Sequence, residues 1–167
     1  MKNSGRSLGH RLMMLSDRIS RIKHRKGHGV HSPFVYGFVR KVLMSKALCE
    51  GSGTALYDSL VANGVAVRRA KELHNLLVYV EGQSYSINEV EGDLSILLAD
   101  YPTEKLAEAF ATAKQEQVTL AICQPYFNHA RQNEVKALID SHLSTTVDNR
   151  AYVLFFNNHL PKQHYRL

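Results

Sequence analysis

The chain has 167 residues, of which 44% are apolar, and this size and composition suit one compact domain with an extension. Its two cysteines, Cys49 and Cys123, lie far apart and outside any CxxC pair, which excludes a disulfide framework and a zinc signature. No uninterrupted apolar stretch approaches the length of about 18 residues that a membrane span needs. We therefore expect a cytoplasmic protein with reduced thiols.

Positive charge is concentrated in the first third of the chain. The formal net charge is +6, but residues 1–49 hold eleven Lys or Arg and one acidic residue, which gives +10, whereas residues 50–167 hold ten basic and fourteen acidic residues, which gives −4. Clustered cations raise the local potential and attract polyanions. The basic arm predicts either a polyanionic partner, such as nucleic acid, a nucleotide or anionic lipid, or docking of the arm on the protein's own acidic body.

The spacing of apolar residues predicts a helix over residues 8–22. Five of them follow a 4-3-4-3 spacing and share one face: Leu8, Leu12, Leu15, Ile19 and Ile22. Such a stripe could lie on the protein's own core, on a second copy, on a partner or on anionic lipid. The stripe is narrow and has no aromatic anchor, which favours core or oligomer packing over a membrane surface.

A cationic, histidine-bearing loop follows at residues 23–31 and leads into a second helix. Ser32 is suited to cap this helix, and Pro33 suits its first position. Because the N–H groups and dipole at a helix start favour negative charge, we expect an anion-binding group here. Its members would be Arg25, Lys26, His28, His31 and Ser32.

Three histidines in this loop, His24, His28 and His31, have a spacing that would align them for a metal on an unbroken helix. Gly27, Gly29 and Pro33 argue against an unbroken helix. We therefore expect a phosphate-facing or solvated basic loop and no metal site.

The middle of the chain is helical in pattern. The helix that starts at residue 33 ends near residues 46–49, and residues 50–53 are the best linker candidate, which divides the chain into a basic helical region (1–50) and an α/β domain (51–167). Residues 54–62 predict a short helix closed by Asn63-Gly64, and residues 65–76 predict another. Residues 76–80 fit either the end of that helix or a strand, because periodicity does not separate the two in a short apolar run.

Strands and helices alternate in the second half. Weak alternation at 84–90 and buried-strand patterns at 94–99 and 118–123 are separated by a helix that starts at residue 103, and a further helix spans about 128–142. Residues 144–147, a turn at Asp148-Asn149 and the aromatic strand 151–156 complete the pattern. Continuous apolar strands that alternate with helices predict an α/β fold: a mostly parallel sheet with an antiparallel C-terminal edge, preceded by N-terminal helices.

Two segments resemble a known family. The run Lys-His-Arg-Lys-Gly-His-Gly-Val-His-Ser-Pro-Phe-Val at 23–35 is similar to the leader of bacterial class I S-adenosylmethionine-dependent methyltransferases that begin with an HGxHSPF motif. The aromatic strand 152–156, followed by Lys162-Gln163-His164-Tyr165, resembles the same group's tail, in which an antiparallel aromatic strand leads into a Lys-Gln-His-aromatic terminus. The resemblance implies a Rossmann-like sheet and S-adenosylmethionine as the cofactor.

The middle of the chain departs from that family. Its members hold the cofactor with a glycine-rich turn after the first strand and an acidic residue at the end of the second. The candidate turn here begins with Glu81 and Gly82, which are therefore the candidate cofactor contacts. Only 13 residues separate Val80 from Leu94, whereas two further strands with their helices need roughly 50. The resemblance thus implies a truncated methyltransferase sheet.

The strand ends depart as well. Metal-dependent relatives bind the ion through acidic residues at the ends of the middle strands, and here Asp100 follows the first buried strand while Cys123-Gln124-Pro125 follows the second. Asp100 could be a remnant of such a site, or it could cap the helix that follows. We assign no catalytic residue, and Asp100 is the only candidate.

These features predict a reduced, non-catalytic methyltransferase-like protein that binds a protein partner or an anionic ligand, with no S-adenosylmethionine unless the family activity is retained. One alternative is a nucleic-acid or phosphate-binding module that uses the basic N-terminal region. Another is an active S-adenosylmethionine-dependent methyltransferase whose missing strands come from another subunit, as in a homo-oligomer.

Overall fold

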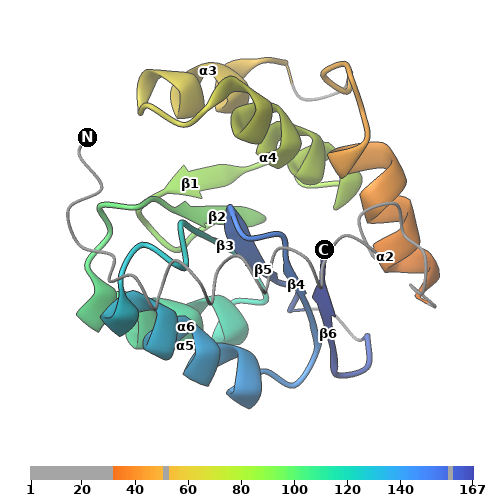
Figure 1. Cartoon of the computed structure of the whole chain (residues 1–167). Coiled ribbons are helices and arrows are strands. Elements are labelled where there is room, and N and C mark those ends of the chain that lie inside the picture. Colours follow the sequence, from red (N-terminus) through yellow and green to blue (C-terminus); the bar gives the residue numbers. More distant parts are fainter. Residues whose placement is uncertain (1–31, 51–52, 158–159) are drawn as a thin grey trace, which may run out of the picture.

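The computed structural model describes residues 32–50, 53–157 and 160–167, which form one α/β unit with helices on both faces of a six-stranded sheet (Figure 1). Several predictions fall outside the described residues. These are the helix expected over 8–22, the loop that carries Arg25, Lys26, His28 and His31, and part of the linker at 50–53.

Three helical segments precede the sheet. α2 (Pro33–Phe38) continues into a π-helical turn, η2 (Val39–Leu43), and the predicted cap at Ser32 is confirmed, since its hydroxyl accepts a hydrogen bond from the Val35 N–H at 3.4 Å. α3 (Ala55–Ala62) matches the predicted short helix. α4 (Val67–Tyr79) decides the open alternative for residues 76–80: they belong to the end of a helix, and the Val80 N–H bonds to the Leu76 carbonyl.

The strands follow the order β1-β2-β3-β5-β4-β6 across the sheet. Their bounds are β1 (Tyr85–Ile87), β2 (Leu94–Leu97), β3 (Thr119–Cys123), β4 (Thr145–Asp148), β5 (Tyr152–Phe155) and β6 (Gln163–Arg166). The predicted sheet, mostly parallel with antiparallel pairing in its C-terminal part, is confirmed. β5 runs against both of its neighbours and lies inside the sheet, and β6, which was not predicted, pairs with β4 in parallel.

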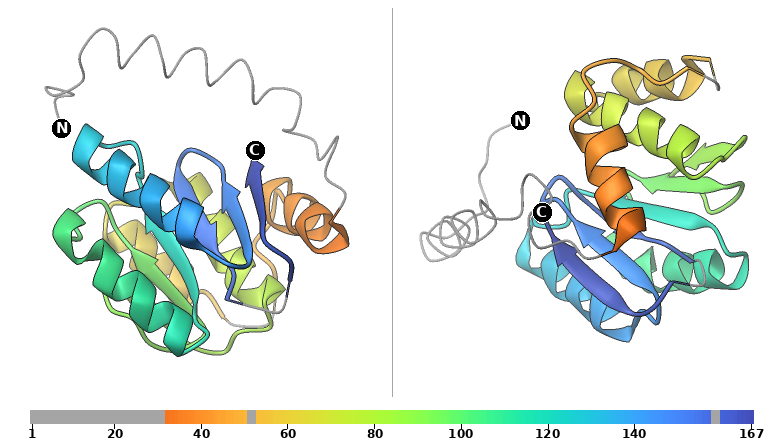
Figure 2. Two further views of the ribbon diagram at one scale, coloured as in Figure 1. Left: turned by 90° about the horizontal axis from the view of Figure 1, so that it is seen from below. Right: turned by 90° about the vertical axis from the view of Figure 1, so that its right-hand side faces the viewer.

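The helices divide between the two faces, as Figures 1 and 2 show. α2, α3 and α4 cover one face, where Phe38, Leu73 and Leu76 pack on Leu154 in a core that joins residues on both sides of the expected boundary at residue 50. The short η3 (Thr103–Lys105), α5 (Leu106–Gln115) and α6 (His129–Ser141) lie on the other face. In the part of the chain that the structure describes, no helix has the length and apolar character to cross a membrane.

The connection between β1 and β2 is unusually short. The two strands are parallel, yet only residues 88–93 join them, whereas parallel neighbours ordinarily need a crossover of about a dozen residues or more. The buried hydroxyls of Ser86 and Ser95 lie 3.0 Å apart, and both donate to the Glu91 carbonyl at 3.1 Å. The chain therefore reverses twice within six residues and contains no crossover helix there.

Two residues fix the ends of this connection. The Asp93 carboxylate accepts hydrogen bonds from the N–H groups of Gln83 at 2.8 Å and Ser84 at 2.9 Å. Gly92 has a φ of +76°, and a Cβ there would lie 2.8 Å from the Ser84 Oγ. The position requires glycine because a left-handed backbone and close contact occur together.

Candidate functional site

A cleft lies at the carboxyl ends of the parallel strands, where open α/β sheets bind their ligands. This cavity of about 640 Å³ is bounded by the ends of β2 and β3, the connection from α3 to α4, the first turn of α4 and the start of β5. We call it the carboxyl-edge cleft. Its polar lining includes Asn63, Arg69, Asp100 and Gln124, and its apolar lining includes Val65, Leu98, Phe127 and Ala151.

Asp100, the predicted remnant of a catalytic strand end, lies on the wall of this cleft. Its Oδ1 accepts a hydrogen bond from the Asn88 Nδ2 at 3.2 Å, and the Asn88 Oδ1 accepts from the Leu98 N–H at 2.8 Å. The alternative that Asp100 caps the next helix is wrong, because the residue at the N-cap of η3 is Pro102. Asp100 is the one carboxylate among the described residues that line the cleft.

A buried ionic cluster supports the opposite wall. The Glu72 carboxylate is 1% exposed and accepts hydrogen bonds from the Arg68 Nε at 2.9 Å, the Arg69 Nη1 at 2.5 Å and the Tyr152 hydroxyl at 3.2 Å. Burial, together with this carboxylate, raises the pKa of Tyr152 well above its ordinary value, so the phenol remains a donor. Two guanidinium groups face one carboxylate; Arg69 lines the cleft, whereas Arg68 lines a separate cavity together with Glu72.

The start of α4 reinforces this positive character. Its N-cap residue is Ala66, which lines the cleft and has no hydrogen-bonding side-chain atom, and its first turn consists of Val67, Arg68, Arg69 and Ala70. The first N–H groups of a helix carry a partial positive charge, although those of Arg69 and Ala70 already donate to the Ala66 carbonyl at 2.7 and 3.0 Å. This wall of the cleft is therefore suited to an anionic group.

Arg131 stabilises the strand ends from the other face of the sheet. Its guanidinium, on a side chain that is 1% exposed, donates to the carbonyls of Tyr101 at 2.8 Å, Leu98 at 2.9 Å and Cys123 at 3.2 Å. Burial lowers its pKa from the ordinary value. The sequence analysis missed this residue, although Arg131, Val135 and Leu138 follow the i, i+4, i+7 spacing of one buried helix face.

The end of β3 differs from that of β2. Cys123 is buried, and desolvation raises the pKa of its thiol to about 12, so the thiol is neutral and a poor nucleophile at neutral pH. Gln124 follows with a φ of +47° and donates its N–H to the Ala151 carbonyl at 2.7 Å. The cleft can bind and orient a ligand through Arg69, Asp100 and Gln124, but its described lining does not combine a nucleophile with a base.

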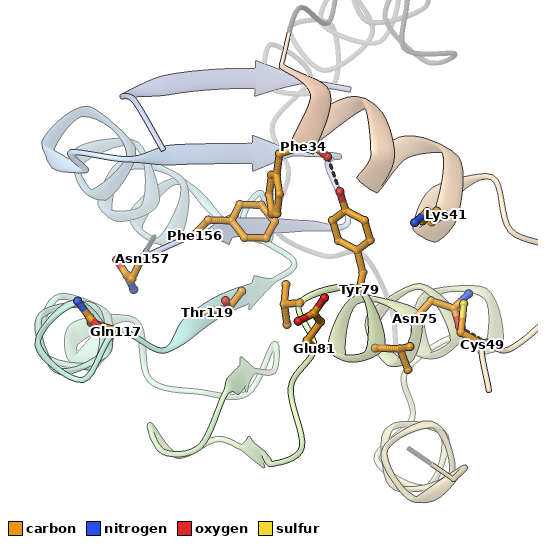
Figure 3. Close-up of a pocket in the computed structure, with 12 residues that line it drawn as sticks. Phe34, Lys41, Cys49, Asn75, Tyr79, Glu81, Gln117, Thr119, Phe156 and Asn157 are labelled. Carbon is orange, nitrogen blue, oxygen red and sulfur yellow. Dashed lines mark hydrogen bonds between the residues drawn. The ribbon is translucent and has the colours of Figure 1, made fainter. Parts of the chain in front are cut away.

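Glu81 and Gly82, the predicted cofactor contacts, lie at the opposite edge of the sheet. Residues 77–80 are the end of a helix and its cap, so the turn at 81–84 precedes β1 instead of following a strand. Glu81 lines a second cavity of about 620 Å³, the amino-edge pocket (Figure 3). Gly82 is buried, and a Cβ there would lie 2.6 Å from the Leu77 Cδ1, which explains the glycine by packing.

The structure therefore separates the predicted site residues. Asp100 and Glu81 line different cavities at opposite edges, and Ser32, the described member of the predicted anion-binding group, caps the short α2. Among the residues that the structure describes, His, Cys, Asp and Glu form no group of three that could hold a metal.

Comparisons of this chain with protein-family models, with curated proteins and with solved structures find no match. The site must therefore be interpreted from its own geometry.

Proposed function

We propose that this chain is a non-catalytic, methyltransferase-like protein that has lost most of the S-adenosylmethionine-binding segment and acts by binding an anionic ligand in the carboxyl-edge cleft. The observation that carries the proposal is the six-residue connection between β1 and β2. A cofactor-binding half would have its glycine-rich turn and its next strand at this point.

The residues of this connection do not suit S-adenosylmethionine. Asn88, Glu89, Val90 and Glu91 follow β1, so the first glycine, Gly92, comes only next to β2. Glycine-rich turns allow the backbone to approach a nucleotide closely, and an acidic residue at the next strand end accepts from the ribose hydroxyls. Here the chain enters β2 directly, and Asn88 is already hydrogen-bonded to Asp100.

The charges of the cleft indicate the kind of ligand. Arg69 and the start of α4 favour an anionic group on one wall, and Arg131 adds a buried positive charge behind the strand ends. Asp100 on the other wall would accept a hydrogen bond from a donor group. Val65, Leu98 and Phe127 suit an apolar body between these ends.

Titration calorimetry and NMR test the two parts of the proposal. We expect no heat with S-adenosylmethionine, and a saturable, one-to-one heat would overturn the loss of cofactor binding. We expect benzoate, a small apolar anion, to shift the amide signals of Ala66, Arg69 and Asp100, and its neutral analogue benzamide to bind about fivefold more weakly. Arg69→Gln should remove this preference, whereas the control Lys114→Gln, on the helix at the other face, should keep it.

The charge distribution favours a second candidate, a nucleic-acid or phosphate-binding role for the basic N-terminal region, because residues 1–49 carry +10. Binding through phosphate contacts weakens steeply with salt. Filter binding of an RNA at two salt concentrations would test this role, and absent or salt-insensitive binding would exclude it. A methyltransferase completed by another subunit would instead show an oligomeric mass together with methyl transfer.

A further inference from the structure

The amino-edge pocket lies on the opposite side of the molecule from the carboxyl-edge cleft. Its walls come from the start of α2, the end of α4, the start of β3 and the end of β5 (Figure 3). The pocket shares no lining residue with the cleft, so an inference about it is independent of the function proposed above.

Three aromatic rings form one wall of the pocket. Phe34 lies edge-on to Phe156 with ring centroids 5.0 Å apart, and its ring centroid is 5.3 Å from that of Tyr79. The Tyr79 hydroxyl donates to the Phe34 carbonyl at 2.7 Å, the dashed line in Figure 3, and this bond fixes the ring against the start of α2. Phe156 is 1% exposed, so the ring surface open to the pocket belongs mainly to the partly exposed Phe34 and Tyr79, whose faces are electron-rich.

The potential around this wall is negative at one point and positive at another. Glu81 follows the end of α4, whose last turn consists of the uncharged residues 76–79, so a carboxylate and the negative end of the helix dipole coincide. Lys41 lies at the other end of the pocket, on the far side of Tyr79 from Phe156 (Figure 3). Glu81 follows Tyr79 by two residues and lines the same pocket as the aromatic wall, whereas Lys41 lies farther along it.

A carboxylate beside aromatic faces is the combination that attracts alkylammonium groups, because ring quadrupoles and the negative charge act on the same cation. We propose that the amino-edge pocket binds a compact organic cation of the alkylammonium class, with the cation between the aromatic wall and Glu81. The cavity volume of about 620 Å³ lies within the range of small-molecule sites.

The test compares choline with 3,3-dimethylbutan-1-ol, which has the same shape but no charge, by NMR titration of the full chain. Choline should shift the amide signals of Glu81 and Thr119 in a saturable way, and the neutral alcohol should bind about fivefold to thirtyfold more weakly. Equal affinities, or no saturable shift at these residues, would overturn the proposal. This comparison needs no variant and does not depend on any variant being folded.

Substitutions test which charged side chain binds the cation. Glu81→Gln should lower the choline affinity by about fivefold or more, whereas the matched control Glu104→Gln, an exposed glutamate on η3 at the other edge, should leave it unchanged. Lys41→Gln should keep the affinity or raise it by up to about twofold, since it removes a like charge. Retained binding in Glu81→Gln, with the fold verified by its NMR spectrum, would overturn the assignment of the cation to Glu81.

Discussion

The two ends of α4 present opposite environments to two cavities of similar size. At its start, Ala66 and Arg69 line the carboxyl-edge cleft, and at its end, Tyr79 and Glu81 line the amino-edge pocket. The helix dipole therefore reinforces the side-chain charge at both ends, positive at the first and negative at the second. One helix laid across the sheet thus presents opposite charge to opposite edges of the molecule.

The two cavities also differ in what holds their walls. The cleft depends on hydrogen bonds of charged groups, in which Arg131 joins the strand ends and Glu72 anchors Arg69. The pocket depends on ring contacts among Phe34, Tyr79 and Phe156. Removing a charged group should therefore affect the cleft more strongly than the pocket.

Arg131→Met should have the largest effect. The substitution leaves two buried carbonyls and the partly buried Tyr101 carbonyl without their guanidinium donor, and we expect the free energy of unfolding to fall by about 3–5 kcal/mol. Urea unfolding followed by circular dichroism measures this loss, and Lys136→Met on the exposed face of the same helix should change stability by less than about 0.5 kcal/mol. In the folded fraction, benzoate binding should weaken while choline binding persists. Equal stability of the two variants would contradict the role given to Arg131.

The two cysteines give one probe for each cavity, since Cys123 lines the cleft and Cys49 lines the pocket. With a pKa of about 12, Cys123 has roughly one thiolate in 10⁴ thiols at pH 8. Cys49 is partly exposed. We expect iodoacetamide to alkylate Cys49 about 100-fold faster or more, as read by mass spectrometry. Similar rates for both thiols would contradict the burial of Cys123.

The sequence predicted those elements whose residues lie close together in the chain. The cap at Ser32, the helix 54–62 and the strands near 94–97 and 119–123 rest on local patterns and are confirmed. β6 was missed because Gln163, His164 and Arg166 are exposed and show no alternation, and the strand exists through backbone pairing with β4.

No local sequence pattern predicted either cavity. The cleft joins residues near 65, 99, 124 and 151, and the pocket joins residues near 34, 79, 117 and 156, so neither could be assembled before the strand order was known. The interpretation of the turn at Glu81 as one that follows a strand was wrong for one physical reason. The buried leucines 73, 76 and 77 follow a helical period, which extends α4 to Tyr79 and moves the turn at Glu81 in front of β1.

Gly92→Ala tests the short connection between β1 and β2. The new Cβ would combine a left-handed backbone with contact to Ser84, and we expect a loss of about 2 kcal/mol in thermal or urea unfolding. Gly64 has the same φ of +76° with nothing within 4 Å of the position of a Cβ. Gly64→Ala should therefore cost only the backbone strain, about 1 kcal/mol. Equal losses would show that contact with Ser84 contributes nothing.

Asp93 should make the stability contributed by this connection depend on pH. Hydrogen bonds from Gln83 and Ser84 lower its pKa below the ordinary 3.8, so the folded state favours the carboxylate. The stabilisation is present above pH 3.8 and is lost as the pH falls through the lower folded-state pKa. Asp93→Asn should therefore be less stable than the wild type at neutral pH, and the difference should shrink in acid-unfolding curves. A constant difference would contradict this assignment.

The smallest expected effect is a difference between the two cavities in the salt dependence of ligand affinity. Benzoate in the cleft is attracted by guanidinium and helix charges, which mobile ions screen, so its affinity should fall by about threefold when NaCl rises from roughly 0.05 to 0.5 M. Choline in the pocket also contacts ring faces at short range, where screening is weaker, and its affinity should fall by about half as much. NMR titrations at the two salt concentrations measure both. Ring contacts are expected to make choline affinity less sensitive to salt than benzoate affinity. A larger loss of affinity for choline would therefore mean that Glu81 alone holds the cation.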